Sequence, residues 1–268
     1  MTAVESGRVA IVTGGGSGIG AAIVRRFAAE GLQVVAVGRD ASRLERIAAE
    51  TGADTMAGDV SRTVDAERIV SSIMDRYGRL DSLIANAGGH GYHAVGDTTD
   101  EEWAQSMRGN LDTAFVMARA AIPPLVDTRG SMVLVSSLAG LFAGPSVAAY
   151  TVAKHAMIGL SKSMARDYGP RGVRVNAICP GWVRTPMADA EMAEFAASRG
   201  ESEATAEDGY RLVSTDVPLR RVAEPAEIAS AVWFLTSDDA SFISGATLVV
   251  DGGAHVVDVP TIEIGRLE

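Results

Sequence analysis

The stretch Thr13-Gly14-Gly15-Gly16-Ser17-Gly18-Ile19-Gly20 decides the fold of this chain. The apolar run Val9–Thr13 leads into it, and Ala21–Phe27 follows with apolar residues at helical spacing, so we expect a strand, a glycine turn and a helix. The N–H groups and dipole at the start of such a helix attract an anion, and glycines let the backbone approach it closely. The stretch therefore predicts a nucleotide-phosphate site. Its predicted contacts are Gly14, Gly16, Ser17, Gly18, Ile19 and Gly20.

Apolar strands and amphipathic helices alternate along the rest of the chain. Further strands are expected at Gln33–Val37, Asp54–Val60, Leu83–Ala85, Ser131–Ser136, Val173–Ile178 and Ala246–Val250. Further helices are expected at Ser42–Glu50, Ala66–Tyr77, Glu101–Ala121 (stopped by Pro123-Pro124), Tyr150–Tyr168 and Glu224–Leu235. This alternation predicts a single α/β domain over residues 1–268, in which a parallel sheet is covered by helices on both faces.

The polar, acidic stretch 187–217 interrupts this alternation. It follows the carboxyl end of a strand, where ligands bind in open α/β sheets. We interpret it as a substrate lid, and an ordinary surface insertion is the alternative.

Composition narrows the classes of partner. With 24 basic and 34 acidic residues the net charge is -10, so the chain should repel nucleic acid and anionic membranes. Its one cysteine, Cys179, excludes an internal disulfide and any multi-cysteine metal site. No apolar run reaches the length of a membrane span. We expect a cytoplasmic protein that acts on a small molecule, without a nucleic-acid or membrane partner and without a metal.

A second motif predicts proton transfer. Tyr150 and Lys154 stand four residues apart on one helix face, and Ser137 precedes the tyrosine at the end of a predicted strand. A neighbouring ammonium favours the phenolate and lowers the pKa of a tyrosine, which can then exchange a proton near neutral pH. Ser137 is placed to bind a substrate oxygen. Together with the glycine turn, this motif predicts a nicotinamide-dependent oxidoreductase acting on an alcohol or a carbonyl.

The end of the second strand bears on the choice of nucleotide. Folds that select NAD place an acidic residue there, on the ribose 2′-hydroxyl. This chain has Val37-Gly38-Arg39, and an arginine can pair with a 2′-phosphate. Asp40 beside it reduces the local positive charge. The sequence therefore favours NADP(H), with NAD(H) as the alternative.

These motifs together resemble the short-chain dehydrogenase/reductase family over roughly residues 8–253. The resemblance is carried by Thr13-Gly14-x-x-x-Gly18-Ile19-Gly20, Asn86-Ala87-Gly88, Asn110, Ser137, Tyr150-x-x-x-Lys154 and Pro180-Gly181. It implies a Rossmann-type doubly wound fold, with seven parallel strands in the order 3-2-1-4-5-6-7. It also implies a homotetramer, formed through the helix that bears Tyr150, for which Met157, Leu160 and Met164 offer an apolar face.

The resemblance also implies individual roles. Tyr150 resembles the catalytic acid/base, Lys154 the residue that lowers its pKa and binds the nicotinamide ribose, and Ser137 the partner of the substrate oxygen. Asn110 resembles the asparagine that holds a water of the proton relay. The remaining cofactor contacts that it implies are Asp59 and Val60 at the adenine, Asn86, Ala87 and Gly88 beside the cofactor, and Pro180, Gly181, Val183 and Thr185 near the nicotinamide. Ser17 stands where some NADP-preferring members carry a basic residue.

The substrate is left open between two classes. One is a 3-oxoacyl thioester, for which Arg129 and Arg171 lie roughly where such reductases contact an acidic carrier protein. The other is a small diol, a hydroxyketone or an apolar secondary alcohol. A non-catalytic dinucleotide-binding sensor is the alternative of a different kind, disfavoured because a sensor needs no tuned tyrosine. His90, Tyr92 and His93 are expected at the substrate mouth rather than on a metal.

Overall fold

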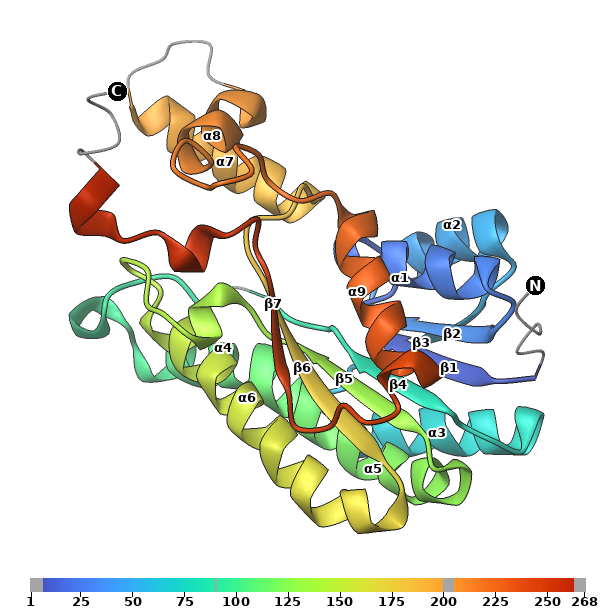
Figure 1. The fold of residues 1–268 in the computed structure, drawn as a ribbon. Coiled ribbons are helices and arrows are strands. Elements are labelled where there is room, and N and C mark those ends of the chain that lie inside the picture. Colours follow the sequence, from blue (N-terminus) through green and yellow to red (C-terminus); the bar gives the residue numbers. More distant parts are fainter. Residues whose placement is uncertain (1–6, 90, 200–204, 263–268) are drawn as a thin grey trace.

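The computed structural model describes residues 7–89, 91–199 and 205–262. A parallel sheet in the order β3-β2-β1-β4-β5-β6-β7 forms its centre (Figure 1), which confirms the predicted fold and strand order. The strands are β1 Val9–Thr13, β2 Gln33–Gly38, β3 Asp54–Ala57, β4 Ser82–Ala85, β5 Ser131–Val135, β6 Arg174–Pro180 and β7 Thr247–Val250.

Helices cover both faces of this sheet. They are α1 Gly18–Ala29, α2 Ala41–Thr51, α3 Thr63–Tyr77, α4 Asp100–Met107, α5 Thr113–Thr128, α6 Ala148–Tyr168, α7 Pro186–Ser198, α8 Ala206–Val213 and α9 Pro225–Thr236. Figure 1 shows α1, α2 and α9 on one face and α3, α5 and α6 on the other. Because side chains alternate along a strand, β1 contributes Val9 and Ile11 to one core and Ala10 and Val12 to the other. Both faces are therefore buried, as the apolar strands predicted.

The predicted helix over Glu101–Ala121 is wrong in both its continuity and its end. A π-helical turn, Arg108–Asp112, separates α4 from α5, and α5 continues through Pro123 and Pro124 to Thr128. Each proline removes a helical hydrogen bond. The helix continues because its apolar face is held in the core, where Met117 and Leu125 are fully buried.

The stretch 187–217 contains two helices that pack on each other beyond the carboxyl ends of β6 and β7 (Figure 1). Thr185 caps α7, and Thr205 caps α8 through a reciprocal pair of hydrogen bonds with Asp208. Ala188, Met192, Tyr210 and Val222 form a small separate core between them. Within the described ranges, no helix is both long and apolar enough to cross a membrane.

Candidate functional site

The glycine turn has a backbone that side chains would obstruct. Gly14 and Gly18 have φ of 66° and 52°, in the left-handed region that favours glycine. A Cβ on Gly20 would lie 2.1 Å from the carbonyl oxygen of Gly14. Helix α1 begins at Gly18, three residues earlier than predicted, so its first N–H groups face the turn. This geometry fits a pyrophosphate.

Gly20→Ala is expected to lower the free energy of unfolding by at least about 2 kcal/mol and to weaken nucleotide binding, because the new methyl group forces the turn apart. Urea unfolding and NADPH titration measure the two effects. Gly96→Ala is the matched control, since Gly96 is exposed and a Cβ there meets nothing within 4 Å. Equal stability and NADPH affinity of the two variants would contradict the close approach at Gly20.

Thr13 and Asn86 join the carboxyl ends of β1 and β4. The Thr13 hydroxyl oxygen accepts hydrogen bonds from the N–H groups of Asn86 (3.0 Å) and Ala87 (2.9 Å), and the Asn86 amide donates to the Thr13 carbonyl (2.9 Å). The strand order reverses between these two strands, which is where open α/β sheets bind ligands. Thr13 stands in the glycine-rich motif but was not among the predicted contacts.

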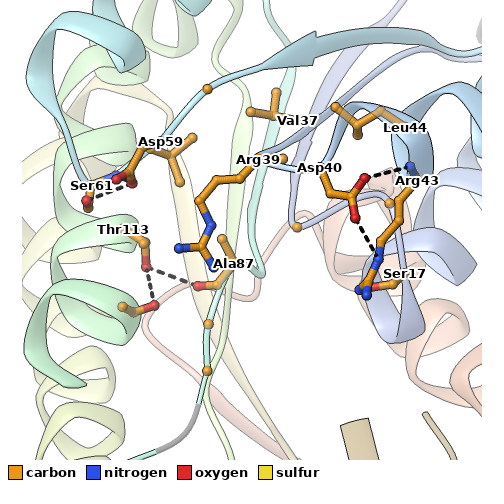
Figure 2. A pocket seen from close by; sticks show the side chains of 18 of the residues that line it. Ser17, Val37, Arg39, Asp40, Arg43, Leu44, Asp59, Ser61, Ala87 and Thr113 are labelled. Atoms are coloured by element: carbon orange, nitrogen blue, oxygen red, sulfur yellow. Dashed lines mark hydrogen bonds and ion pairs between the residues drawn. The ribbon is translucent and has the colours of Figure 1, made fainter. Parts of the chain in front are cut away.

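A cavity of about 460 Å³ extends from the glycine turn along this edge of the sheet (Figure 2). Its lining includes the predicted residues Gly14, Gly16, Ser17, Arg39, Asp59, Val60, Ala87 and Gly88. Asp59 is held by its own loop, since its carboxylate accepts from the N–H and hydroxyl of Ser61 at 3.1 and 2.7 Å. The shape and the donors fit a dinucleotide.

Arg39 extends into this cavity on the side of Ala87, and Arg43 lies on the side of Ser17 (Figure 2). Asp40 caps α2 and pairs with Arg43 at 3.1 Å. A hydrogen bond from Ser42 is the main cause that lowers the pKa of this carboxyl. The Asp40 carboxylate was expected to reduce the positive charge at Arg39. It pairs with Arg43 instead.

Several residues of the lining were not predicted from the sequence. Arg43, Gln105, Arg108, Thr113 and Met187 all face the cavity. Arg43 could have been found, because the first turn of a helix that follows a strand's carboxyl end borders the ligand crevice. Arg108 had no such signal, since it lies in the π-helical turn that the pattern did not predict.

The predicted proton-transfer residues do not line the cavity but come together next to it, since Lys154 approaches the lining residue Gly88. Ser137 follows β5, while Tyr150 and Lys154 lie one turn apart on α6. The Lys154 ammonium lies 5.5 Å from the centre of the Tyr150 ring and donates to the carbonyl of Val135 at 3.0 Å. Lys154 is 4% exposed, so this ammonium is held in place by the core.

Asn110 lies inside the π-helical turn and is fully buried. Its amide donates to the carbonyl of Ser106 at 3.0 Å, and its side-chain oxygen accepts from the N–H of Gly89 at 3.1 Å. A Cβ on Gly88 would lie 3.1 Å from that oxygen and 3.3 Å from the Lys154 nitrogen. The π turn therefore brings Asn110 and Lys154 to the same glycine.

Burial is the main influence on the titrating groups. It raises the pKa of Tyr150, which the hydrogen bond with Ser137 lowers and the charge of Glu191 raises further. Burial also lowers the pKa of Lys154 to about 8. The Lys154 ammonium lies over the ring and bonds to a carbonyl, and its lowering of the pKa of Tyr150 stays a prediction. A raised pKa favours the protonated form of the Tyr150 phenol.

Of the segment after β6, Met187 lines the cavity, whereas the predicted contacts Pro180, Gly181, Val183 and Thr185 are not part of its lining. Gly181, which follows Pro180, donates to Val250 at 3.0 Å, and Val183 is buried. Thr185 caps α7, and its methyl carbon would lie 3.2 Å from a Cβ on Gly18. The start of α7 is thereby placed directly against the glycine turn. Among the described residues, no group of three or more His, Cys, Asp or Glu could hold a metal, and His90 lies outside them.

Comparisons with known proteins agree with this geometry. A family model described as enoyl-(acyl carrier protein) reductase matches residues 14–255. Protein MoaE of Klebsiella aerogenes is 47% identical over 95% of this chain and 98% of its own length. Meso-2,3-butanediol dehydrogenase of Serratia marcescens is 35% identical over 94% and 96%. The solved structure of Thermoplasma acidophilum aldohexose dehydrogenase superposes with a TM-score of 0.87 at 33% identity, covering 95% of this chain and 96% of that one.

Proposed function

The chain belongs to the short-chain dehydrogenase/reductase family and is an NAD(P)-dependent oxidoreductase acting on CH–OH donors; from this premise we propose that it interconverts a secondary alcohol and a ketone, with Tyr150 as acid/base. The observation that carries the proposal is the meeting of Ser137, Tyr150 and Lys154 beside the dinucleotide-shaped cavity. Titration with NADPH and NADH, followed by turnover of ketones and alcohols with the tighter nucleotide, tests it. The retained proton-transfer set gives no support to a non-catalytic sensor.

The protein's own residues handle the oxygen and its proton. When bound, the nucleotide supplies the hydride in reduction and accepts it in oxidation. The Ser137 hydroxyl holds the substrate oxygen, and the neutral phenol of Tyr150 donates its proton to that oxygen as it gains charge. Lys154 stabilises the resulting phenolate through its charge and is placed toward the nicotinamide ribose. Asn110, fixed by two hydrogen bonds, is placed to hold a water that returns a proton to the site.

The proposed nucleotide is NADP(H), with NAD(H) as the weaker ligand. Arg39 lines the cavity where a ribose 2′-phosphate would lie, and Arg43 adds a second guanidinium on the other side. Ser17 provides no positive charge of its own. The two arginines therefore support the choice of NADP(H).

Among the substrates left open, we favour the small polar alcohol over the 3-oxoacyl thioester. Arg129 and Arg171 lie before the amino ends of β5 and β6, at the edge of the sheet opposite Tyr150 in the same chain. A carrier protein bound there would face away from this chain's site. The related meso-2,3-butanediol dehydrogenase is named for a polar alcohol, which supports the same choice.

The pair α7–α8 is proposed as the substrate lid. Arg184 holds it to the body through Glu207 at 2.8 Å and Glu224 at 3.2 Å, and the Tyr210 hydroxyl donates to Asp189 at 2.8 Å. Such exposed ion pairs hold only weakly. The lid can therefore move relative to the sheet while its own small core stays intact.

A homotetramer and a cytoplasmic location remain predictions. The apolar face proposed for assembly needs correction, because Met157 and Met164 are buried in the core of their own chain and Leu160 packs against it. Val152 on α6 and Phe115 on α5 are instead 45% and 44% exposed. These side chains, rather than the methionines, are available to a second copy.

The raised pKa of Tyr150 predicts opposite pH dependence in the two directions. Reduction needs the phenol protonated, so its kcat/KM should stay flat from about pH 6 to about pH 8. Oxidation needs the phenolate, so its kcat/KM should rise about tenfold per pH unit and flatten above about pH 8, where Lys154 loses its charge. Initial rates across this range measure both. A flat oxidation profile would contradict the raised pKa of Tyr150.

A further inference from the structure

A second cavity, of about 380 Å³, lies at the edge of the sheet where the strands begin, opposite the edge that carries the glycine turn. Four neighbouring strands, β1, β4, β5 and β6, each bring one arginine to its lining, at the first residue of the strand or shortly before it. These arginines are Arg8, Arg79, Arg129 and Arg174. Of the described residues that line this cavity, only Asp81 and Asp238 are acidic, so positive charge is in excess. Its volume is typical of cavities that bind small molecules.

One of the two acidic residues is already engaged within the protein. The Asp81 carboxylate accepts two hydrogen bonds from Arg79, at 2.9 and 2.6 Å, and a third from the N–H of Val9 at 2.8 Å. Its side chain is 7% exposed, so the pair is anchored at the wall of the cavity. Asp81 therefore neutralises Arg79, and the exposed carboxylate of Asp238 is the acidic group of the lining that remains for the other three arginines.

Two of these arginines are held together at the end of α9. Arg174 donates to the carbonyl oxygens of Leu235, Thr236 and Ser237 at 2.7, 3.3 and 3.0 Å. Arg8 donates to the same carbonyl of Thr236 at 3.0 Å. Burial, and then the charge of Arg8, lower the pKa of Arg174, as expected for two like charges in proximity. Carbonyls at a helix end carry only partial negative charge, so these bonds fix the two guanidiniums without neutralising them.

Arg129 supplies the guanidinium that the protein leaves available. Within the described part of the chain it has no hydrogen bond or ion pair, although it lines the cavity. It ends α5 with a φ of 52°, and a Cβ on Gly172 would lie 2.9 Å from its Cγ. The aliphatic part of Arg129 therefore lies along the backbone of Gly172, where a side chain would displace it. This packing places the side chain at the cavity and leaves its five N–H donors for a ligand.

We propose that this second cavity binds a phosphate group, as free phosphate or as a small phosphate monoester, with Arg129 as its main contact and the charges of Arg8 and Arg174 beside it. A phosphate monoester carries a charge of about -1.5 to -2 at pH 7, which matches the excess of arginine over aspartate, and guanidinium groups bind its oxygens in pairs. The bound group links the amino ends of neighbouring strands to the end of α9 and stabilises the folded protein. It lies at the edge of the sheet opposite Tyr150 and takes no part in hydride transfer.

The test measures phosphate binding while the nucleotide cavity is filled. Because the glycine turn and Arg39 also attract phosphate, the protein is saturated with NADPH and then dialysed to equilibrium against radiolabelled inorganic phosphate. Arg129→Gln should weaken the binding that remains by at least about tenfold, since a charged hydrogen-bonding group is lost. The control Arg46→Gln removes the same charge from an exposed position of α2 outside both cavity linings, and it should change the binding by less than about twofold.

Urea unfolding of the same NADPH-saturated variants gives a second measurement. Without phosphate, Arg129→Gln should unfold at the same urea concentration as the intact protein, because Arg129 has no partner among the described residues. Phosphate at constant ionic strength should raise the unfolding midpoint of the intact protein and of Arg46→Gln. The rise should be smaller in Arg129→Gln, and an equal rise in all three proteins would speak against the site.

Competition with the bound label identifies the form of the ligand. Release by ethyl phosphate supports a site for a phosphate monoester, and release by unlabelled phosphate alone supports a site for free phosphate. Equal release by acetate overturns the preference for a doubly charged anion. No binding to the NADPH-saturated protein, or equal weakening by Arg129→Gln and Arg46→Gln, overturns the site itself. Because Arg129→Gln should turn over alcohols as the intact protein does, failure of this site leaves the proposed oxidoreductase standing.

Discussion

Tyr150→Phe is expected to lower kcat by roughly 10²–10⁴-fold while the affinity for NADPH stays within about twofold. The variant removes one oxygen and keeps the ring that lies against the Lys154 ammonium. The phenol is the group placed with Ser137 to give or take the proton of the substrate oxygen. In the phenylalanine variant, Ser137 can still donate a hydrogen bond to the substrate oxygen, but no acid remains to protonate that oxygen. Steady-state turnover and NADPH fluorescence titration, measured on the same preparation, separate catalysis from binding.

Two controls make this result specific to proton transfer. Tyr168→Phe removes a phenol at the other end of α6 and should leave kcat unchanged. The pH dependence of the alcohol oxidation should also disappear from the residual activity of Tyr150→Phe, since the titrating group is gone. Undiminished kcat in Tyr150→Phe would refute the acid/base assignment. Tight NADPH binding by the intact protein, without turnover of any alcohol or ketone, would revive the sensor.

The sequence predicted those parts of the molecule whose pattern repeats over a whole element. Strands such as Ser131–Val135 are apolar on both faces, and this alone indicates a parallel sheet between two helical layers. The glycine turn was predictable because only residues without a Cβ fit where Gly20 meets the Gly14 carbonyl. Residues at strand ends, such as Ser137, follow from the same sheet, since ligands bind at its carboxyl edge.

Features that depend on packing were not predictable. Pro123 and Pro124 predict the end of a helix when only the sequence is considered. The helix continues through them because its apolar face is buried in the core. The π turn at Asn110 has no local signature, so Arg108 was missed with it. The pKa of Tyr150 depends on how deeply α6 lies in the protein, whereas the spacing to Lys154 predicts only that the two are neighbours.

The two helices within the stretch 187–217 could not be foreseen either. Its polar, acidic and weakly patterned sequence predicts no helix, whereas the structure forms α7 and α8 there. Each helix begins at a threonine cap, and Ala188, Met192 and Tyr210 are buried where the two helices pack.

Arg39→Asp is expected to reverse the nucleotide preference. A hydrogen bond to a charged group contributes about 1.5–3 kcal/mol, so losing the guanidinium should weaken NADPH binding by roughly 10- to 100-fold. The new carboxylate would repel a 2′-phosphate and accept hydrogen bonds from the ribose hydroxyls of NADH, which should bind more tightly. The ratio of kcat/KM for NADPH and NADH, with one ketone, measures the reversal.

Arg46→Asp is the matched control, because Arg46 is an exposed residue of α2 outside the cavity lining and the change in net charge is the same. An unchanged ratio in Arg39→Asp would refute the role of Arg39. The second guanidinium of the cavity would then be the candidate, and Arg43→Asp would have to produce the reversal instead. Because Arg43 already pairs with Asp40 at 3.1 Å while Arg39 extends into the open space, we expect the larger effect at Arg39.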